Sequence, residues 1–269
     1  MHHYSLENQV VIQPKLKSEE YFNTLQDSLT NGGELSEFEY KKILKDLNND
    51  KSSTAICAIG YAHAMMGNND DAINWFESFS PFTELVTLKA YGSLLKILGR
   101  NRDLINLTLN HTDSFKDIWF SWMSMEYYYI IGDVSNSARK AREFLSMLPE
   151  NKNKERAEYS ISQQLDSLSR VYKSGYCTPE QFKMVSDLTL DILDKYHYPL
   201  RYVELFYYEG EGASYEIGIF LDNDDFKTLS NLNDELIKRM IKIKELDTCE
   251  VTPCFSEGGM SNWRYIHGA

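Results

Sequence analysis

Apolar residues recur every three to four positions along most of the chain, which is the spacing of amphipathic helices. The stretch 55–77 holds two such segments, separated by Gly67 and two asparagines. Asp70 places acid in the first turn of the second segment, where the helix dipole favours it. Ala72 and Phe76 are four apart and share one face of that segment. The pattern predicts a hairpin of two short helices.

Helical spacing also predicts a hairpin ahead of this one. Ser18 is in a position to cap a helix with one apolar face, made by Tyr21, Leu25 and Leu29. Ser36 is in a position to cap a second helix, whose apolar positions are Phe38, Ile43, Leu44 and Leu47. The segment before Ser18 contains apolar residues followed by Pro14, and we expect an arm or a short strand there.

A further hairpin is predicted after Pro149. A polar turn is expected at 151–154, followed by a helix over 156–173 that ends at Gly175. Thr178 followed by Pro179 is a strong helix start, with threonine as N-cap and proline at the first helical position. That second helix extends to Tyr196.

Beyond Pro199 the period of the pattern changes from 3.6 to 2, which indicates strands. Strands are predicted over 201–209 and 214–221, joined by a glycine-rich hairpin turn at 210–212. A helix follows that starts at the acidic run 222–225, and its apolar stripe is Phe226, Leu229, Leu232, Leu236, Met240 and Ile243. A third strand is predicted over 249–255, which completes a small α+β lobe.

The hairpin at 55–77 resembles a tetratricopeptide repeat. If Gly67 is the turn glycine, the small residue expected seven positions earlier is Gly60. The alanine expected after the turn is Ala72, and the large apolar residue after it is Phe76. Further turn glycines follow at Gly99 and Gly132, at intervals of about 32 and 33 residues, which is close to the period of the family. The resemblance covers about residues 53–150.

The resemblance implies a mostly α fold, a stack of α-α hairpins of the α-solenoid kind followed by the small α+β lobe. We expect an N-terminal arm or strand at 1–16, a helical repeat domain at 17–197 and the C-terminal lobe at 198–269. In the family, the first helix of each repeat lines a concave groove that binds a peptide or a helix. Carried onto this chain, that implies partner-binding residues at Tyr61, Met65, Lys89, Lys96, Trp119, Trp122, Glu126 and Tyr129.

Two interpretations of this groove are open. The aromatic residues and lysines suit a partner segment with apolar side chains and some acid. However, the helix expected around 118–131 is apolar nearly all round, which is typical of a helix buried on both sides, and the C-terminal lobe is a candidate to fill the groove. The carboxylate clamp of the family is not expected, because Cys57 stands where its first lysine would be.

Charge and cysteine content restrict the class of protein. The formal net charge of −12 argues against a nucleic-acid binder, which needs a basic surface. The 4 cysteines have no metal-binding spacing, so we expect free thiols in a reducing compartment. No apolar stretch is long enough to cross a membrane and the N-terminus does not have the pattern of a signal peptide. We therefore expect a cytoplasmic protein.

Motifs that carry catalytic chemistry are missing from the sequence. The 6 histidines are not in any zinc spacing, and no nucleophile elbow, phosphate loop or kinase motif is present. No cofactor or metal is expected. If the chain is an enzyme, the best candidates lie in the C-terminal lobe, around Glu209, Glu216, Cys249 and Cys254.

The sequence thus favours a protein-binding module that acts as an adaptor, chaperone or regulator without catalysis of its own. The partner would be a protein or a peptide, with no role for nucleic acid or membrane. One alternative is an inhibitor of the immunity-protein or antitoxin kind, whose acidic surface masks a basic partner. The other alternative is an enzyme with its site in the C-terminal lobe.

Overall fold

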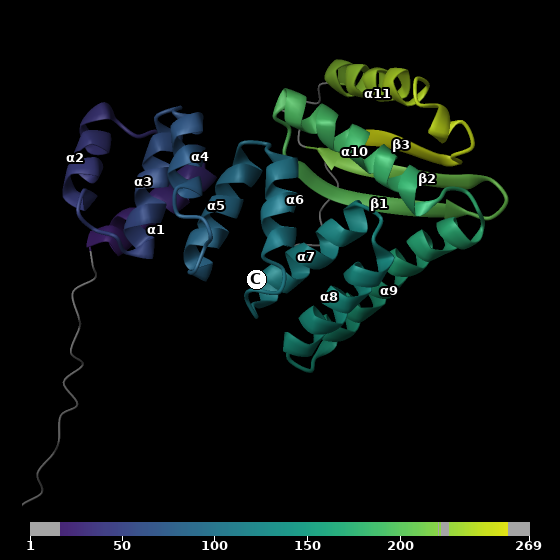
Figure 1. Cartoon of the computed structure of the whole chain (residues 1–269), viewed down its shortest axis with the longest axis horizontal. Coiled ribbons are helices and arrows are strands. Elements are labelled where there is room, and N and C mark those ends of the chain that lie inside the picture. The colour runs from purple at the N-terminus through teal and green to yellow at the C-terminus, as the bar shows by residue number, and fades with distance from the viewer. Residues whose placement is uncertain (1–16, 220, 222–225, 258–269) are drawn as a thin grey trace, which may run out of the picture. The chain divides into compact units, whose positions relative to one another are not determined.

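The computed structural model describes residues 17–219, 221 and 226–257. The chain divides into two compact units, Met1–Leu94 and Leu95–Ala269. Helices make up the described part of the first unit, and the second unit adds a three-stranded sheet to its helices (Figure 1). The predicted fold class is therefore confirmed: the chain is mostly helical, with helical hairpins followed by a small α+β portion.

The first unit is built around α3. It contains α1 (Lys17–Thr30), α2 (Glu37–Leu47), α3 (Ser53–Met65), α4 (Asn69–Glu77) and most of α5 (Leu85–Ile97). α3 packs against α1, α2 and α4, and its alanines are buried at these contacts. Phe76 of α4 lies over Gly60, where an added Cβ would come within 2.3 Å of the phenylalanine ring. Gly60 is required because the two helices approach so closely.

The helices of the second unit are α6 (Asn101–Asn110), α7 (Ile118–Ile130), α8 (Val134–Met147), α9 (Lys152–Lys173) and α10 (Pro179–Tyr196). α7 packs against α6 and α8, and α9 packs against α8. Asp117 caps α7 through the amide of Phe120, and Thr178 caps α10 with a complete capping box. The predicted start of α10 at Thr178 and Pro179 is confirmed.

A glycine in the left-handed conformation ends the first helix of each hairpin at the predicted places. Gly67, Gly99 and Gly132 have φ values of 76°, 64° and 83°. In each case the next residue donates its N–H to the carbonyl five residues earlier, as in a Schellman motif. Gly175, after α9, has the same geometry, with Tyr176 N–H bonded to Val171 O. These turns reverse the chain and set the hairpin lengths.

The sheet of the second unit contains β1 (Leu200–Tyr208), β2 (Gly212–Ile219) and β3 (Val251–Glu257) in the order β1-β2-β3. β1 and β2 form an antiparallel hairpin, and β3 runs parallel to β2. The chain crosses from β2 to β3 through α11 (Phe226–Met240) and a 3-10 turn at Lys244–Leu246. Tyr215 of β2 contacts the ring of Phe182 on α10 and donates a hydrogen bond to Ile130 O of α7. The sheet therefore shares a core with the helices.

The outer edge of β3 is covered by α11. Asn233 accepts a hydrogen bond from Phe255 N–H at 2.7 Å and donates one to Phe255 O at 3.0 Å. Pro253, two residues earlier in β3, lacks an N–H and is tolerated at a sheet edge for that reason. β1 forms the other edge of this sheet.

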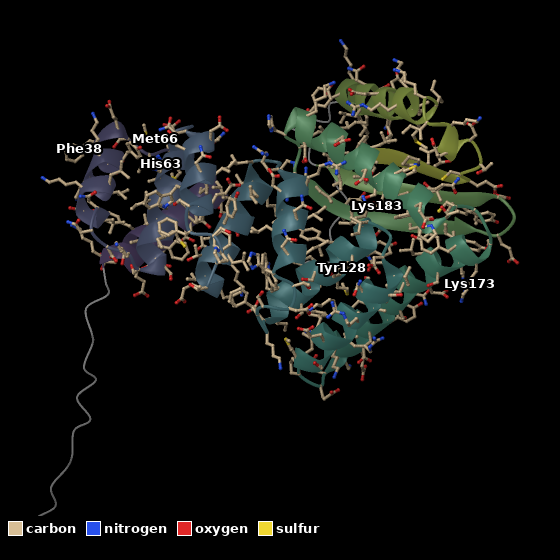
Figure 2. All side chains as sticks on the ribbon, viewed as in Figure 1. Phe38, His63, Met66, Tyr128, Lys173 and Lys183 are labelled. Carbon is tan, nitrogen blue, oxygen red and sulfur yellow. The ribbon has the colours of Figure 1, made fainter. Side chains whose placement is uncertain are left out.

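Several local predictions differ from the structure. α9 begins at Lys152 rather than after a polar turn, because Asn151 caps it by accepting hydrogen bonds from the amides of Asn153 and Lys154. Ser18 lies buried within α1 instead of capping it, and bonds to Thr54. Phe38 and Phe226 were expected on buried faces but are 78% and 71% exposed, and Figure 2 shows Phe38 on the surface of its helix.

The compact units divide the chain at a different place from the predicted domains. The predicted boundary between 197 and 198 falls inside the second unit, because the sheet packs against α9 and α10. The expected arm at 1–16 and the acidic helix start at 222–225 lie outside the described residues. Within the described ranges, no helix combines the length and apolar character that crossing a bilayer requires.

Candidate binding groove

Three of the predicted partner-binding residues lie in the first unit. Tyr61 is only 1% exposed and donates a hydrogen bond to Ala90 O, so the prediction that it contacts a partner is corrected: it is a core residue. Met65 is partly exposed at the end of α3. Lys89 is partly exposed and borders a shallow hollow with Phe22 and Val86.

The other five lie in the second unit, and the structure brings three of them together. Lys96, Trp122 and Glu126 line one hollow. Trp119 is partly exposed in the first turn of α7 and does not line it. Tyr129 is 1% exposed, so its predicted role as an anchor is also corrected. The sheet covers the face of α7 at this end, where Tyr215 bonds to Ile130 O.

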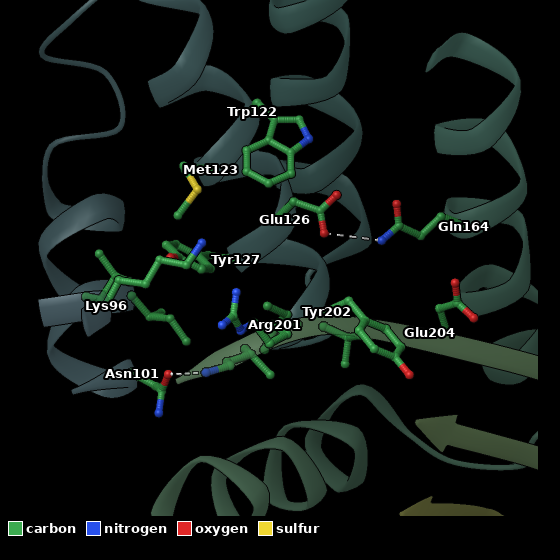
Figure 3. A pocket seen from close by; sticks show the side chains of 15 residues that line it. Lys96, Asn101, Trp122, Met123, Glu126, Tyr127, Gln164, Arg201, Tyr202 and Glu204 are labelled. Carbon is green, nitrogen blue, oxygen red and sulfur yellow. Dashed lines mark hydrogen bonds between the residues drawn. The ribbon is translucent and has the colours of Figure 1, made fainter. Parts of the chain in front are cut away.

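Two adjoining hollows remain open along α7, and together they form what we term the α7 groove. The first is lined by residues of α5, α6, α7, α9 and β1, and its enclosed volume is small, about 70 Å³ (Figure 3). The second lies between α7, α8 and the N-terminal half of α9. Trp122, Glu126 and Gln164 line both hollows, so they are continuous. Only the second hollow, at about 670 Å³, is in the range of ligand-binding pockets.

β1 contributes consecutive residues to the α7 groove. All residues from Leu200 to Glu204 line the first hollow. Side chains of a strand alternate between its two faces, so neighbouring residues can all border one space only where that space lies along the strand edge. The side chain of Val203 is buried at 5% exposure. We infer that the groove runs along the edge of β1.

The hydrogen-bond register identifies which main-chain groups face this edge. Ala213 of β2 donates its N–H to Glu250 O, on the side of β3. The N–H and C=O of one strand residue point to the same side, so the residue opposite Ala213 points away from β2. That residue is Tyr207. Because the direction of the main-chain groups alternates along a strand, those of Leu205 and Val203 point the same way as those of Tyr207. The main-chain groups of Val203 therefore point outward from β1, toward the groove.

A register shift at the start of β1 shapes the end of the groove. Leu200 pairs with Ile219 and Tyr202 with Gly218, so Arg201 is an extra residue in β1. Such a bulge turns a side chain away from the regular alternation of the strand. Arg201 is exposed and lines the groove (Figure 3).

Asn101 attaches the start of β1 to α6. Its side chain accepts a hydrogen bond from Leu200 N–H at 2.8 Å and donates one to Tyr198 O at 3.0 Å. Asp194 of α10 accepts hydrogen bonds from both the main-chain and side-chain nitrogens of Asn101. Asn101 is 3% exposed, so these bonds are shielded from water and fix the floor of the groove.

Charges of both signs lie in the groove. Burial, together with the nearby Arg201, lowers the pKa of Lys96 to about 8. Burial raises the pKa of Glu126 to about 7, and a hydrogen bond from Gln164 opposes this shift. Burial and the neighbouring carboxylate of Glu216 raise the pKa of Glu204. Lys96 and Arg201 lie toward Asn101, whereas Glu126 and Glu204 lie toward Gln164 (Figure 3).

The groove contains residues that the sequence pattern did not single out. Asn101 and Gln164 belong to no recognisable motif, and the sequence pattern gave residues 200–204 no role in a site. The only signal for them was the change of period at Pro199, which placed a strand after the helices. Contact between the start of that strand and α6 depends on tertiary packing.

The residues suggested for an enzyme in the C-terminal lobe do not form one cluster. Glu209 is exposed in the hairpin turn, whereas Glu216 lies within β2 and accepts a hydrogen bond from Tyr202. Cys254 is opposite Glu216 on β3, and Cys249 precedes that strand. Among the described residues, no group of three or more His, Cys, Asp or Glu side chains is placed to hold a metal ion.

Comparison with known proteins adds no family to this description. No protein-family model matches the chain, and neither a curated protein nor a solved structure is significantly similar to it. The resemblance to tetratricopeptide repeats therefore stays a prediction from individual residues. The α7 groove and the side chains that line it are the features of the structure that suggest a function.

Proposed function

We propose that the protein is a non-catalytic interaction module that binds an extended segment of a partner protein in the α7 groove. The observation that carries this proposal is the groove along the β1 edge, lined by five successive strand residues, Leu200 to Glu204. A partner segment that pairs with an exposed strand edge gains main-chain hydrogen bonds whatever its sequence. The opposite edge of the sheet is hydrogen-bonded by Asn233 of α11, whereas α9 packs against β1 and leaves the groove open beside Leu200 to Glu204.

The side chains of the groove define the kind of segment that fits. Trp122 is 8% exposed, and the exposed part of its ring borders both hollows, which suits contact with an apolar side chain of the partner. Lys96 and Arg201 suit a carboxylate at the end of the groove near Asn101. Glu126 and Glu204 suit a hydrogen-bond donor or a cation at the other end. The preferred segment is therefore extended, with an apolar residue and charges of both signs.

This interaction suits an adaptor or a regulator. The second candidate is an inhibitor that masks a basic partner, and the net charge of −12 favours it. The two candidates differ in how binding depends on salt. Main-chain hydrogen bonds along β1 and apolar contact at Trp122 depend only weakly on salt. Long-range attraction between an acidic surface and a basic partner falls steeply as salt is added.

The test is selection of peptides from a displayed random library on the full-length chain, followed by affinity measurements on Arg201→Glu. Arg201 is exposed, so the fold should survive this change. We expect the selected peptides to bind the variant at least about tenfold more weakly, because a groove charge is reversed. Lys173→Glu is the matched control: Lys173 is exposed on α9 and does not line the groove, so affinity should be unchanged (Figure 2).

Other outcomes would replace the proposal. Peptides that bind Arg201→Glu as tightly as the parent chain would exclude the groove. Selection of basic sequences only, with binding abolished by moderate salt in every case, would favour the inhibitor. If no peptide is selected while a substrate screen detects turnover that is lost in Glu126→Gln, the chain would be an enzyme, with the site in the groove and not in the lobe.

A further inference from the structure

Two cysteines that are far apart in the sequence meet where the helices of the second unit join the sheet. Cys177 precedes the N-cap of α10, and Cys249 lies between the 3-10 turn and β3. Both are free thiols; Cys177 is buried and Cys249 is partly exposed. Each of the two side chains shifts the pKa of the other, which places the two sulfur atoms close together.

The main chain holds this pair in place independently of the thiols. Glu250 N–H donates to Tyr176 O at 2.6 Å, directly beside the two cysteines. Each cysteine Cα is within about 3 Å of an atom of that bond, which limits the Cα–Cα distance to under about 8 Å. Gln181 adds hydrogen bonds to Glu245 O and Thr248 Oγ1. Disulfides form when the Cα atoms are about 4.4–6.8 Å apart, so little movement is needed.

We propose that Cys177 and Cys249 form a redox site, in which Cys249 reacts with a hydroperoxide and Cys177 then closes a disulfide. The division of labour follows from exposure. Cys249 is partly exposed and so accessible to a small oxidant, whereas Cys177 is buried. The proposal is independent of the function proposed for the α7 groove.

The electrostatics of the pair agree with these roles. The interaction with Cys177 lowers the pKa of Cys249, against the effect of burial and of Glu250. The same interaction and burial raise the pKa of Cys177. A lower pKa increases the fraction of Cys249 that is thiolate, and the thiolate is the reactive form. Burial raises the pKa of Cys57 to about 12 and also raises that of Cys254, so both stay protonated.

The reaction balances with hydrogen peroxide as the oxidant. The Cys249 thiolate attacks one peroxide oxygen; an S–O bond forms, the O–O bond breaks, and the leaving hydroxide takes up a proton as water. Cys249 is now a sulfenic acid. The sulfur of Cys177 attacks it, the S–O bond breaks, and the second hydroxide leaves with the proton of Cys177 as water. Two thiols are oxidised to one disulfide while one peroxide is reduced to two waters.

The disulfide would join the loop before α10 to the loop before β3. Because the linked residues are far apart in sequence, it would restrict the unfolded chain strongly. We expect the oxidised full-length protein to unfold at a temperature roughly 5–10 °C higher than the reduced protein. A dithiol reductant should reverse this shift.

The experiment treats the reduced full-length protein with stoichiometric hydrogen peroxide and analyses it by mass spectrometry. We expect loss of two hydrogens and a cross-linked peptide that contains Cys177 and Cys249. The matched control is Cys254→Ser, which removes the other partly exposed thiol and should form the disulfide as fast as the parent chain. Cys177→Ser should accumulate a sulfenic acid at Cys249 that dimedone traps, whereas Cys249→Ser should give none at residue 177.

Two results would overturn the proposal. One is oxidation of Cys254 or Cys57 at least as fast as that of Cys249. The other is absence of the Cys177–Cys249 cross-link in the oxidised parent chain, which requires no variant and so holds even if Cys177→Ser folds poorly. Circular dichroism of each variant before oxidation separates loss of reactivity from loss of fold.

Discussion

Burial at the α7 groove makes Glu126 an acid that the folded chain prefers to keep protonated. Its pKa is raised from 4.5 to about 7, mainly by desolvation. The folded state therefore binds a proton more tightly than the unfolded state. Stability is unaffected below the unfolded pKa and decreases as the pH rises from about 4.5 to 7, where the buried carboxyl must ionise. A shift of about 2.5 pKa units corresponds to roughly 3 kcal/mol.

Glu126→Gln should remove this cost. Glutamine keeps the shape and can still accept the hydrogen bond that Gln164 donates to Glu126. We expect the variant to be more stable than the parent chain at pH 8, by up to about 3 kcal/mol, and closely similar to it at pH 4.5. Urea denaturation at both pH values measures the difference.

The control for this prediction is Glu155→Gln, an exposed glutamate that also borders the groove. It should change stability by less than about 0.5 kcal/mol at either pH. A Glu126→Gln variant that is less stable than the parent chain at pH 8 would mean that the ionised carboxylate has a favourable partner in the fold.

Close approach of α3 and α4 sets the geometry of the first hairpin at the scale of elements. Gly60→Ala would place a Cβ within 2.3 Å of the Phe76 ring, which is itself fully buried. We expect a loss of about 1–3 kcal/mol, since either the ring or the helix must shift. Thermal unfolding followed by circular dichroism checks it.

Gly67→Asn is the contrasting variant. Gly67 has a positive φ but open space around it, and asparagine tolerates that conformation. It should cost under about 1 kcal/mol. If it costs as much as Gly60→Ala, space between the helices is not what requires glycine at position 60.

Asn101 links elements that the chain order separates, namely α6, the end of α10 and the start of β1. Asn101→Ala leaves the buried N–H of Leu200 and the carbonyl of Tyr198 without this partner. We expect a loss of about 2–4 kcal/mol in the free energy of unfolding.

Asn106→Ala tests whether this effect is specific. Asn106 is exposed on the same helix, and its loss should change stability by less than about 0.5 kcal/mol. Equal effects at positions 101 and 106 would show that α6 is merely sensitive to alanine substitution, and that the hydrogen bonds to β1 contribute little.

Helix ends that depend on one or a few neighbouring residues could be predicted from the sequence. Gly67, Gly99 and Gly132 end helices because only a residue that accepts positive φ fits there, and Thr178 begins one because its side chain satisfies the first amides. Asn151 carries the same kind of signal, but its polar neighbours resembled a turn.

Features that depend on packing between distant segments were not predictable. Asn101 holds the start of β1 only because the fold brings Leu200 next to it. Arg201 reaches the groove because of a register shift in β1, and no residue in the sequence predicts that shift. Tyr129 has the composition of a binding residue, yet the sheet covers it, and only the fold shows this. Of the residues predicted on this helix, Trp122 and Glu126 line the groove and Tyr129 is buried.

At the scale of the whole molecule, every residue that lines the α7 groove belongs to the second compact unit. A fragment over 85–269, which retains all of α5, should therefore keep its helical circular dichroism and bind the selected peptides within about threefold of the full chain. A folded fragment that has lost the peptides would mean that the first unit takes part in binding.

The most direct test of docking along β1 is amide hydrogen exchange on the full-length chain, with and without a selected peptide. We expect the peptide to slow exchange of the Val203 amide at least about tenfold, because a partner strand accepts its hydrogen bond. The amide of Tyr202, which points toward β2, should change much less. Protection confined to the helices, with Val203 exchanging as before, would contradict docking along β1.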